Sequence, residues 1–261
     1  MSSFDSYISR VNEYIDSMKE LGRKVKEYDC PGSVEELEKD LPVQIGPGAN
    51  PGIILRSNTF TELGNPAAGS SAFLLWTEEP SLVRDGRITI IGPDIPESPG
   101  LSLPFGQILL MAGRELDPNK QEGMELCQHI SDYLEGYMVR SSTQNIWGRV
   151  SKDAAARGFT LQTLGKALMI VMKKGVPEIE SMEIVFVTSG REDLKPLEEI
   201  AGEVAGIRKD IIREFWKSQG YDLECDLDCH SCNDKEVCDD IKEMLRARWE
   251  KKQADALESE G

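Results

Sequence analysis

The sequence predicts an α+β protein: a mixed sheet with flanking helices, an N-terminal helix, and a C-terminal cysteine-rich metal loop followed by a helix. Three observations lead to this prediction. The 261 residues are 39% hydrophobic and 29% charged, as in globular proteins that bury a core. Short apolar runs between turn residues fill the first half, and strands alternate with helices only in the second half. Four of the six cysteines fall within one short loop, residues 225–238.

An N-terminal helical segment is expected over residues 1–39. Apolar residues recur at spacings of three and four across 4–27, which predicts a helix with one apolar face. After a Pro-Gly break, Ser33 and Glu36 have the spacing of a capping box, which predicts a short second helix.

An α+β domain is expected over residues 40–220, and residues 221–261 would carry the four-cysteine loop, a charged helix and an acidic tail. Apolar runs bounded by Gly, Pro and Asn predict strands with short connections, and therefore mostly antiparallel pairing. The predicted strands are 53–55, 72–77, 87–91, 106–112, 145–150 and 182–188, and the predicted helices are 117–138, 151–157, 161–174, 192–219 and 235–253.

Composition and charge exclude several classes of function. Thirty Lys and Arg against forty-six Asp and Glu give a net charge of −16, which disfavours binding to nucleic acid or to an anionic membrane. No apolar run approaches the ~20 residues of a membrane-spanning helix. No basic head precedes an apolar stretch, so we expect a cytoplasmic protein. The sequence has no glycine-rich motif of the nucleotide-binding type. It has only two histidines, which disfavours a hydrolase with a catalytic triad.

One stretch of this acidic chain is basic. Residues 139–175 hold seven Lys and Arg but a single acid, Asp153. Such a stretch can form a site for a small anion or an acidic partner. It can equally be the solvated face of a Lys-rich helix, and the two interpretations stay open at this point.

The clustered cysteines predict a metal centre. Their spacing is Cys225-x3-Cys229-x2-Cys232-x5-Cys238. Four thiolates on one loop can bind a 4Fe–4S cluster or a single Zn²⁺. Zinc ribbons separate two CxxC pairs by a dozen or more residues, so the compact spacing favours the 4Fe–4S cluster. Zinc is the alternative, and no metal at all is the third possibility.

Five segments of the chain resemble acetyl-CoA synthase, the beta subunit of the CO dehydrogenase/acetyl-CoA synthase complex. The resemblance covers that enzyme's middle α+β domain and the start of its cluster-bearing domain, roughly residues 40–240. The segments are DLPVQIGPG (40–48), GRITIIGPDI (86–95), LPFGQILLMAGREL (103–116), LEGYMVRSSTQNIWGRVSKDAAARGF (134–159) and LGKAL (164–168).

The resemblance implies a cofactor and a place in metabolism. In the family a 4Fe–4S cubane is bridged to two nickel sites for CO-methylating acetyl-CoA synthesis. Cys229 and Cys232 match the CxxC pair of the family's cubane ligands, and Cys238 matches the next ligand. Cys225 takes the place of the family's later fourth ligand. The family's Cys-Gly-Cys for the distal nickel is absent from these residues.

We therefore expect an accessory or partner subunit of anaerobic one-carbon metabolism without its own dinickel site. It would dock a corrinoid protein, CO dehydrogenase or an electron carrier. The alternatives are a non-catalytic 4Fe–4S electron-transfer or interaction module, and a zinc-binding scaffold.

The resemblance also gives the basic stretch a candidate ligand, coenzyme A. Arginines and a tryptophan of the family's middle domain handle CoA, and the matching positions are Trp147, Arg149 and Lys152, flanked by Arg140 and Arg157. An indole can stack on adenine, and cations can pair with phosphates. The alternative is that Trp147 belongs to the core.

Overall fold

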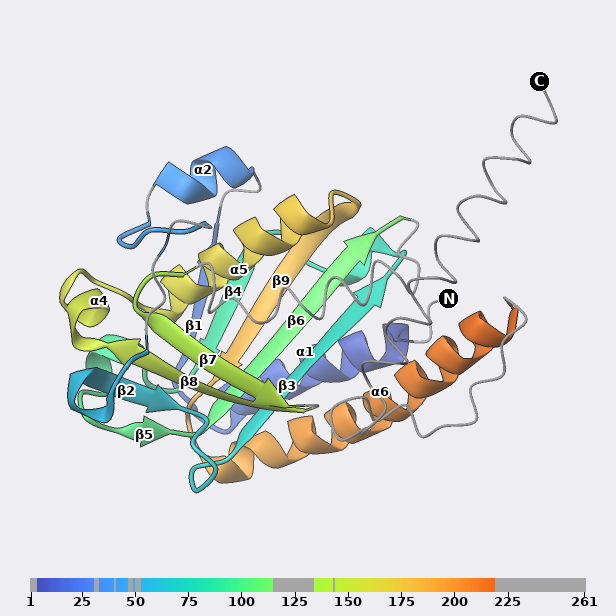
Figure 1. Ribbon diagram of the computed structural model, residues 1–261. Helices are drawn as coiled ribbons and strands as arrows, with labels where there is room; N and C mark the ends of the chain where they lie inside the picture. Colours follow the sequence, from blue (N-terminus) through green and yellow to red (C-terminus); the bar gives the residue numbers. More distant parts are fainter. Residues whose placement is uncertain are drawn as a thin grey trace. The chain divides into compact units, whose positions relative to one another are not determined.

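The computed structural model describes residues 4–30, 33–39, 41–46, 49, 53–114, 134–142 and 144–218 (Figure 1). The cysteine loop, the helix predicted over 235–253 and residues 117–133 of the helix predicted over 117–138 lie outside these residues. Nine strands are described: β1 (Val25–Asp29), β2 (Thr59–Leu63), β3 (Ser70–Thr77), β4 (Arg87–Ile91), β5 (Ser102–Leu103), β6 (Phe105–Gly113), β7 (Tyr137–Ser142), β8 (Asn145–Ser151) and β9 (Ile179–Val187). The described α-helices are α1 (Asp5–Glu20), α2 (Val34–Lys39), α4 (Lys152–Ala156), α5 (Leu161–Gly175) and α6 (Arg191–Ser218).

The strands form two sheets, which confirms the α+β class and the mixed sheet. The larger sheet has the order β1-β4-β9-β6-β3, and the smaller one β5-β2-β8-β7. In the larger sheet β6 runs antiparallel to β9 but parallel to β3, while β4 runs parallel to β9. The prediction of mostly antiparallel pairing was therefore wrong for β3 and β6. They pair side by side because β4, which lies between them in sequence, is placed on the far side of β9.

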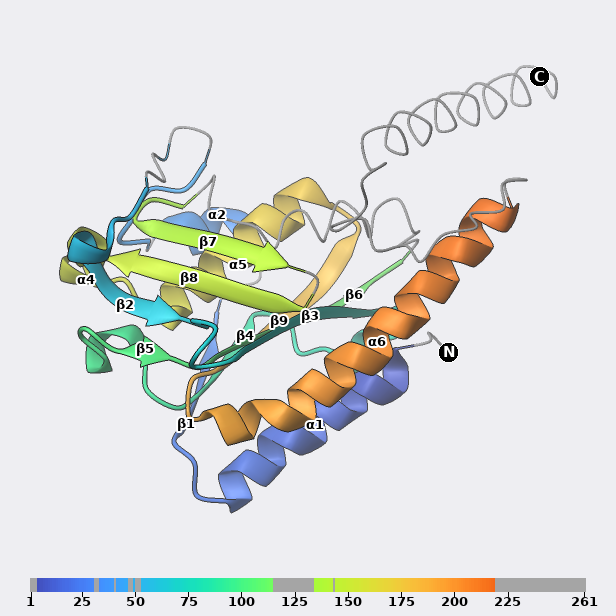
Figure 2. The ribbon, with the colours of Figure 1, turned by 60° about the horizontal axis from the view of Figure 1, so that its bottom comes forward.

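The larger sheet is covered on both faces, which explains its apolar strands. Helices α1 and α6 lie on one face, and α5 and the smaller sheet lie on the other (Figures 1 and 2). Every residue of β6 is buried, as expected for an uninterrupted apolar run at the centre of a layered fold. Glycine at position 165 lets α5 approach the sheet, because a Cβ there would lie 2.7 Å from the Ile88 side chain.

Three predicted elements differ from the structure. The first helix ends at Glu20, because Gly22 adopts φ +72° and reverses the chain. Residues 25–29 then form β1 against β4. No strand forms over 53–55; the chain is extended there and the strand begins at Thr59. Residues 137 and 138, placed at the end of a predicted helix, open β7. At residues 25–29 and 137–138 pairing with another strand outweighs the local pattern, whereas residues 53–55 are paired with no strand in the described structure.

The described helices were also compared with the requirements for crossing a membrane. Among the residues that the structure describes, no helix is both long enough and apolar enough to do so.

Candidate functional site

The candidate site lies on the outer face of the smaller sheet. Along a strand, side chains point alternately to the two faces. One set faces the larger sheet and is buried: Leu63, Tyr137, Val139, Ile146 and Val150. The alternate positions place Glu62 of β2, Arg140 of β7, and Trp147 and Arg149 of β8 on the opposite face.

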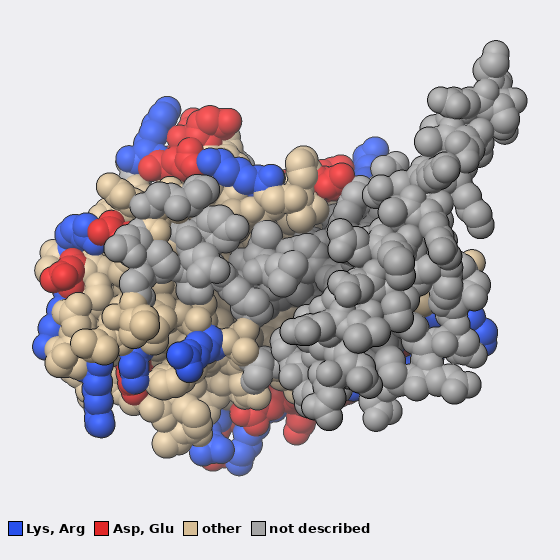
Figure 3. All heavy atoms as spheres, viewed as in Figure 1, with Lys and Arg blue, Asp and Glu red and all other residues tan. Residues whose placement is uncertain are grey.

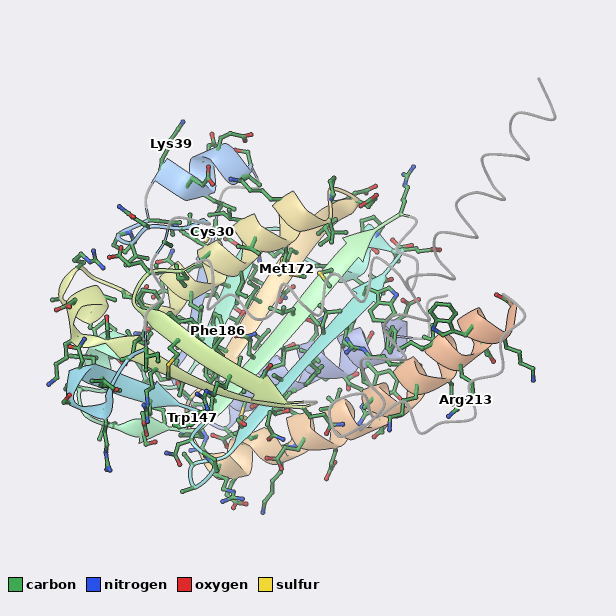
Figure 4. The ribbon with its side chains drawn as sticks, in the orientation of Figure 1. Cys30, Lys39, Trp147, Met172, Phe186 and Arg213 are labelled. Atoms are coloured by element: carbon green, nitrogen blue, oxygen red, sulfur yellow. The ribbon has the colours of Figure 1, made fainter. Side chains whose placement is uncertain are left out.

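Arg140 and Trp147 are directly paired across β7 and β8. Arg140 is exposed and makes no ion pair in the described part of the chain. Trp147 is half-buried, and its indole Nε1 is buried without a hydrogen-bond partner. Figure 4 labels Trp147 at this sheet. Among the described residues, an arginine without an ion-pair partner therefore lies beside an indole ring whose N–H makes no hydrogen bond.

Arg149 is held by the protein itself. Its Nε donates to Glu62 Oε1 at 2.8 Å and its guanidinium also donates to the Ile54 carbonyl at 3.2 Å. The guanidinium carbon lies 4.8 Å from the centre of the Trp147 ring, a cation–π contact. Burial opposes ionisation of Glu62, but hydrogen bonds from Asn65 and Arg149 outweigh it and lower the pKa of this carboxyl. The charge of Arg149 is thus already balanced.

Lys152 and Arg157, the other two predicted cations, also have partners within the protein, and they lie beyond the C-terminal end of β8. Lys152 begins α4, and its Nζ donates to the carbonyl of Ser57 at 2.8 Å. Arg157 pairs with Glu135 at 3.0 Å, and its hydrogen bond lowers the pKa of that carboxyl. The five predicted residues therefore do not converge: Arg140 and Trp147 share a groove, Arg149 supports it, and Lys152 and Arg157 lie elsewhere.

The groove at Trp147 has a volume of about 490 Å³. Its lining residues are Gly64, Pro66, Gly69, Ser70, Arg140, Ser141, Asn145, Ile146, Trp147, Arg191 and Glu198. Gly64 adopts φ +69°, and a Cβ there would lie 2.1 Å from the Ile146 carbonyl oxygen, so this wall requires glycine.

Arg191 is a groove residue that the sequence analysis missed. It lies at the start of α6, outside the basic stretch, and donates to the Ala67 carbonyl at 3.4 Å. No local signal identifies it, since α6 reaches the groove only through the fold. Arg191 and Arg140 supply two cations, and Glu198 supplies one acid. Over β7 and β8 the surface shows Lys and Arg and little Asp or Glu (Figure 3). The arrangement suits an anion attached to a planar group.

The metal-site prediction concerns residues that the structure leaves out. Cys225, Cys229, Cys232 and Cys238 all lie outside the described residues. Within the described part, no group of three or more His, Cys, Asp or Glu could hold a metal ion. Cys30 is half-buried there, and burial raises the pKa of its thiol. It is therefore a packing residue and a suitable control for experiments on the cluster.

Comparison with known proteins agrees with the resemblance. Residues 41–192 match the family model of the CO dehydrogenase/acetyl-CoA synthase complex beta subunit. The acetyl-CoA decarbonylase/synthase complex subunit beta 1 of Methanosarcina thermophila is 29% identical over 63% of this chain and 35% of its own length. The beta subunit of Methanothermobacter thermautotrophicus is 32% identical over 58% of this chain and 32% of its own length.

Another relative is matched over a longer part of this chain. The carbon monoxide dehydrogenase/acetyl-CoA synthase subunit alpha of Moorella thermoacetica is 32% identical over 68% of this chain and 25% of its own length. The chain thus spans between a quarter and about a third of the length of these relatives. The region matched by the family model contains the Arg149–Glu62 pair and every residue that lines the groove at Trp147 except Glu198.

Proposed function

The chain belongs to the CO dehydrogenase/acetyl-CoA synthase complex beta-subunit family, and on that premise we propose that it is an iron–sulfur accessory subunit of such a complex in the acetyl-CoA pathway. The observation that carries the proposal is the family match over residues 41–192, which include most strands of both sheets. The relatives are named as subunits of multi-subunit complexes. Its partners would be the corrinoid protein, CO dehydrogenase or an electron carrier.

The proposed cofactor is a 4Fe–4S cluster held by Cys225, Cys229, Cys232 and Cys238. The donor set fits the cofactor: four thiolates within one short loop match the number of ligands that a cubane needs. When bound, the cluster would supply one-electron chemistry. Nine acids against two bases between residues 222 and 243 would disfavour an added electron and lower its reduction potential.

The proposed role is accessory because these residues do not provide the nickel ligands of the family. No Cys-Gly-Cys occurs among the 261 residues. We therefore expect this chain alone to form no acetyl-CoA from a methyl donor, CO and CoA. Robust product formation by the purified chain would contradict the accessory role.

The groove at Trp147 is the proposed CoA site. Arg140 and Arg191 offer cations to the phosphates of CoA, and the ring of Trp147 offers a surface to adenine. Arg149 would act indirectly, because its contacts with Glu62 and with the Trp147 ring hold the indole in place.

Metal analysis after anaerobic purification tests the proposed function. About four iron and four sulfide per chain, with the broad absorption of sulfur-to-iron charge transfer, are the result expected for a cubane. Cys232→Ser should abolish this absorption, whereas Cys30→Ser should leave it intact. One zinc without colour would support the zinc scaffold instead, and nickel above trace would contradict the absence of a nickel site.

Copurification then separates the accessory subunit from an independent iron–sulfur module. The tagged chain should retain CO dehydrogenase or corrinoid subunits through a washing step at low salt. A cluster-loaded chain that binds none of these purified subunits would support the independent electron-transfer module.

A further inference from the structure

A second surface of the smaller sheet carries exposed apolar side chains. Four large hydrophobic side chains of the described residues are exposed, and three of them gather here: Ile53, Leu55 and Leu101, at 84%, 63% and 52%. Ile54 is buried between the first two, and Leu55 has extended backbone angles. Alternate residues of an extended chain point the same way, so Ile53 and Leu55 share one side. We call these three residues the apolar cluster.

The apolar cluster borders a groove distinct from the one at Trp147. This second groove has a volume of about 580 Å³ and is lined by Thr59, Phe60, Pro99, Gly100, Lys152, Ala155 and Ala156. Leu101 follows Gly100 directly, and the Leu55 carbonyl accepts a hydrogen bond from the Thr59 hydroxyl at 3.0 Å. Leu55 and Leu101 therefore lie beside residues that line this groove, and Ile53 lies two residues before Leu55 on the same side of the chain.

Backbone hydrogen bonds hold the rim in place. The amide of Gly100 donates to the Phe60 carbonyl at 2.6 Å, and the amide of Glu62 donates to the Leu101 carbonyl at 3.0 Å. Arg149 holds the other side through the Ile54 carbonyl at 3.2 Å. Because this surface is already ordered, little conformational entropy is lost when a partner binds to it.

The charges around the second groove favour an acidic partner. Among the described residues, Lys152 is the one charged residue that lines this groove, and the neighbouring Arg56 is exposed and has no ion pair. The nearby acids are Asp153, which is exposed, and Glu62, which Arg149 neutralises. A local excess of cations within a chain of net charge −16 attracts carboxylates and is unfavourable for another cation.

We propose that the apolar cluster and the second groove dock another subunit, through a segment that presents apolar side chains beside carboxylates. An apolar centre with a charged rim is the composition of a protein–protein interface, and exposed apolar patches mark such sites. The inference rests on the proposed function, since it assigns a surface to the contact that an accessory subunit must make.

The test measures binding of the purified CO dehydrogenase and corrinoid subunits by calorimetry, with the full chain loaded with its metal. Leu55→Glu, Leu101→Glu and Arg56→Glu should each raise Kd at least tenfold. Leu21→Glu is the matched control: Leu21 is 66% exposed at the end of α1, on the other face of the larger sheet, and its Kd should stay within twofold. Circular dichroism confirms that each variant is folded.

The outcomes separate this proposal from the proposed function. A subunit that binds the native chain and the Leu55→Glu chain equally well would overturn the docking surface while leaving the accessory role intact. Absence of binding to the native chain by either subunit would overturn both. Sedimentation that shows a dimer of the native chain, abolished by Leu55→Glu, would assign the surface to a second copy and refute the proposed partner.

Discussion

Arg140 and Arg149, the two arginines nearest Trp147, should contribute differently to ligand binding and to the stability of the fold. Arg140 is exposed and has no carboxylate partner in the described residues, whereas Arg149 donates to Glu62 at 2.8 Å with both side chains 18% exposed. If the groove binds CoA, Arg140→Gln removes a cation that is free to meet phosphate. Arg149→Gln removes a cation whose charge is already balanced.

The expected magnitudes follow from these environments. One cation–phosphate contact at an exposed site contributes about 1 kcal/mol, so Arg140→Gln should weaken CoA binding roughly fivefold and leave the free energy of unfolding unchanged. Arg149→Gln leaves Glu62 largely buried without its partner, which should cost about 2 kcal/mol of stability, between the values for surface and buried pairs. Its effect on the Kd of CoA should stay within about twofold.

Calorimetric titration with CoA and dephospho-CoA, at low and high salt, measures the binding, and urea denaturation measures the stability. Added salt should weaken CoA binding, and dephospho-CoA should bind less tightly. Arg84→Gln is the control, because Arg84 is exposed and pairs with Asp29 at 3.0 Å on the larger sheet. A larger loss of affinity for Arg149→Gln than for Arg140→Gln would contradict these assignments, as would a Kd that changes neither with salt nor with removal of the 3′-phosphate.

Three further predictions concern buried and paired groups. The Tyr137 hydroxyl is buried without a hydrogen-bond partner in the described structure, so Tyr137→Phe should raise the free energy of unfolding by about 1 kcal/mol; a lower urea midpoint would contradict this. Glu183 is fully buried and lies 2.6 Å from Arg87, so Glu183→Gln should lower the free energy of unfolding by about 3 kcal/mol, because Arg87 loses its charged partner. The double variant with Glu183→Leu and Arg87→Met should recover most of this loss in the same urea assay. Hydrogen bonds from two lysines lower the pKa of Glu97 from 4.5 to about 2, so its contribution is complete above pH 4.5 and is lost as the pH falls towards 2. Because the side chain is 37% exposed, that contribution is at most about 1 kcal/mol, and a pH titration of stability for Glu97→Gln should lack it.

Features that depend on residues adjacent along the chain could be predicted from the amino-acid sequence. The strand predicted over 106–112 and the helix predicted over 161–174 appear in the structure as β6 and α5, with bounds that differ by at most one residue. The family also followed from the sequence, because its motifs are contiguous segments. The cysteine spacing predicts a metal site in the same way, and that prediction awaits the metal analysis.

Strand pairing, and which charged side chains of the described residues lack an ionic partner, became known only from the folded structure. Residues 25–27 were predicted as the end of a helix, yet residues 25–29 pair with β4, distant in sequence, and form β1. The seven bases of residues 139–175 look equivalent in sequence, but Arg149 meets Glu62 from another strand while Arg140 meets no carboxylate in the described part. Arg191 joins Trp147 in one groove although 43 residues lie between them. The physical reason is that a side chain's charge and exposure depend on partners brought together by packing, which spacing along the chain does not encode.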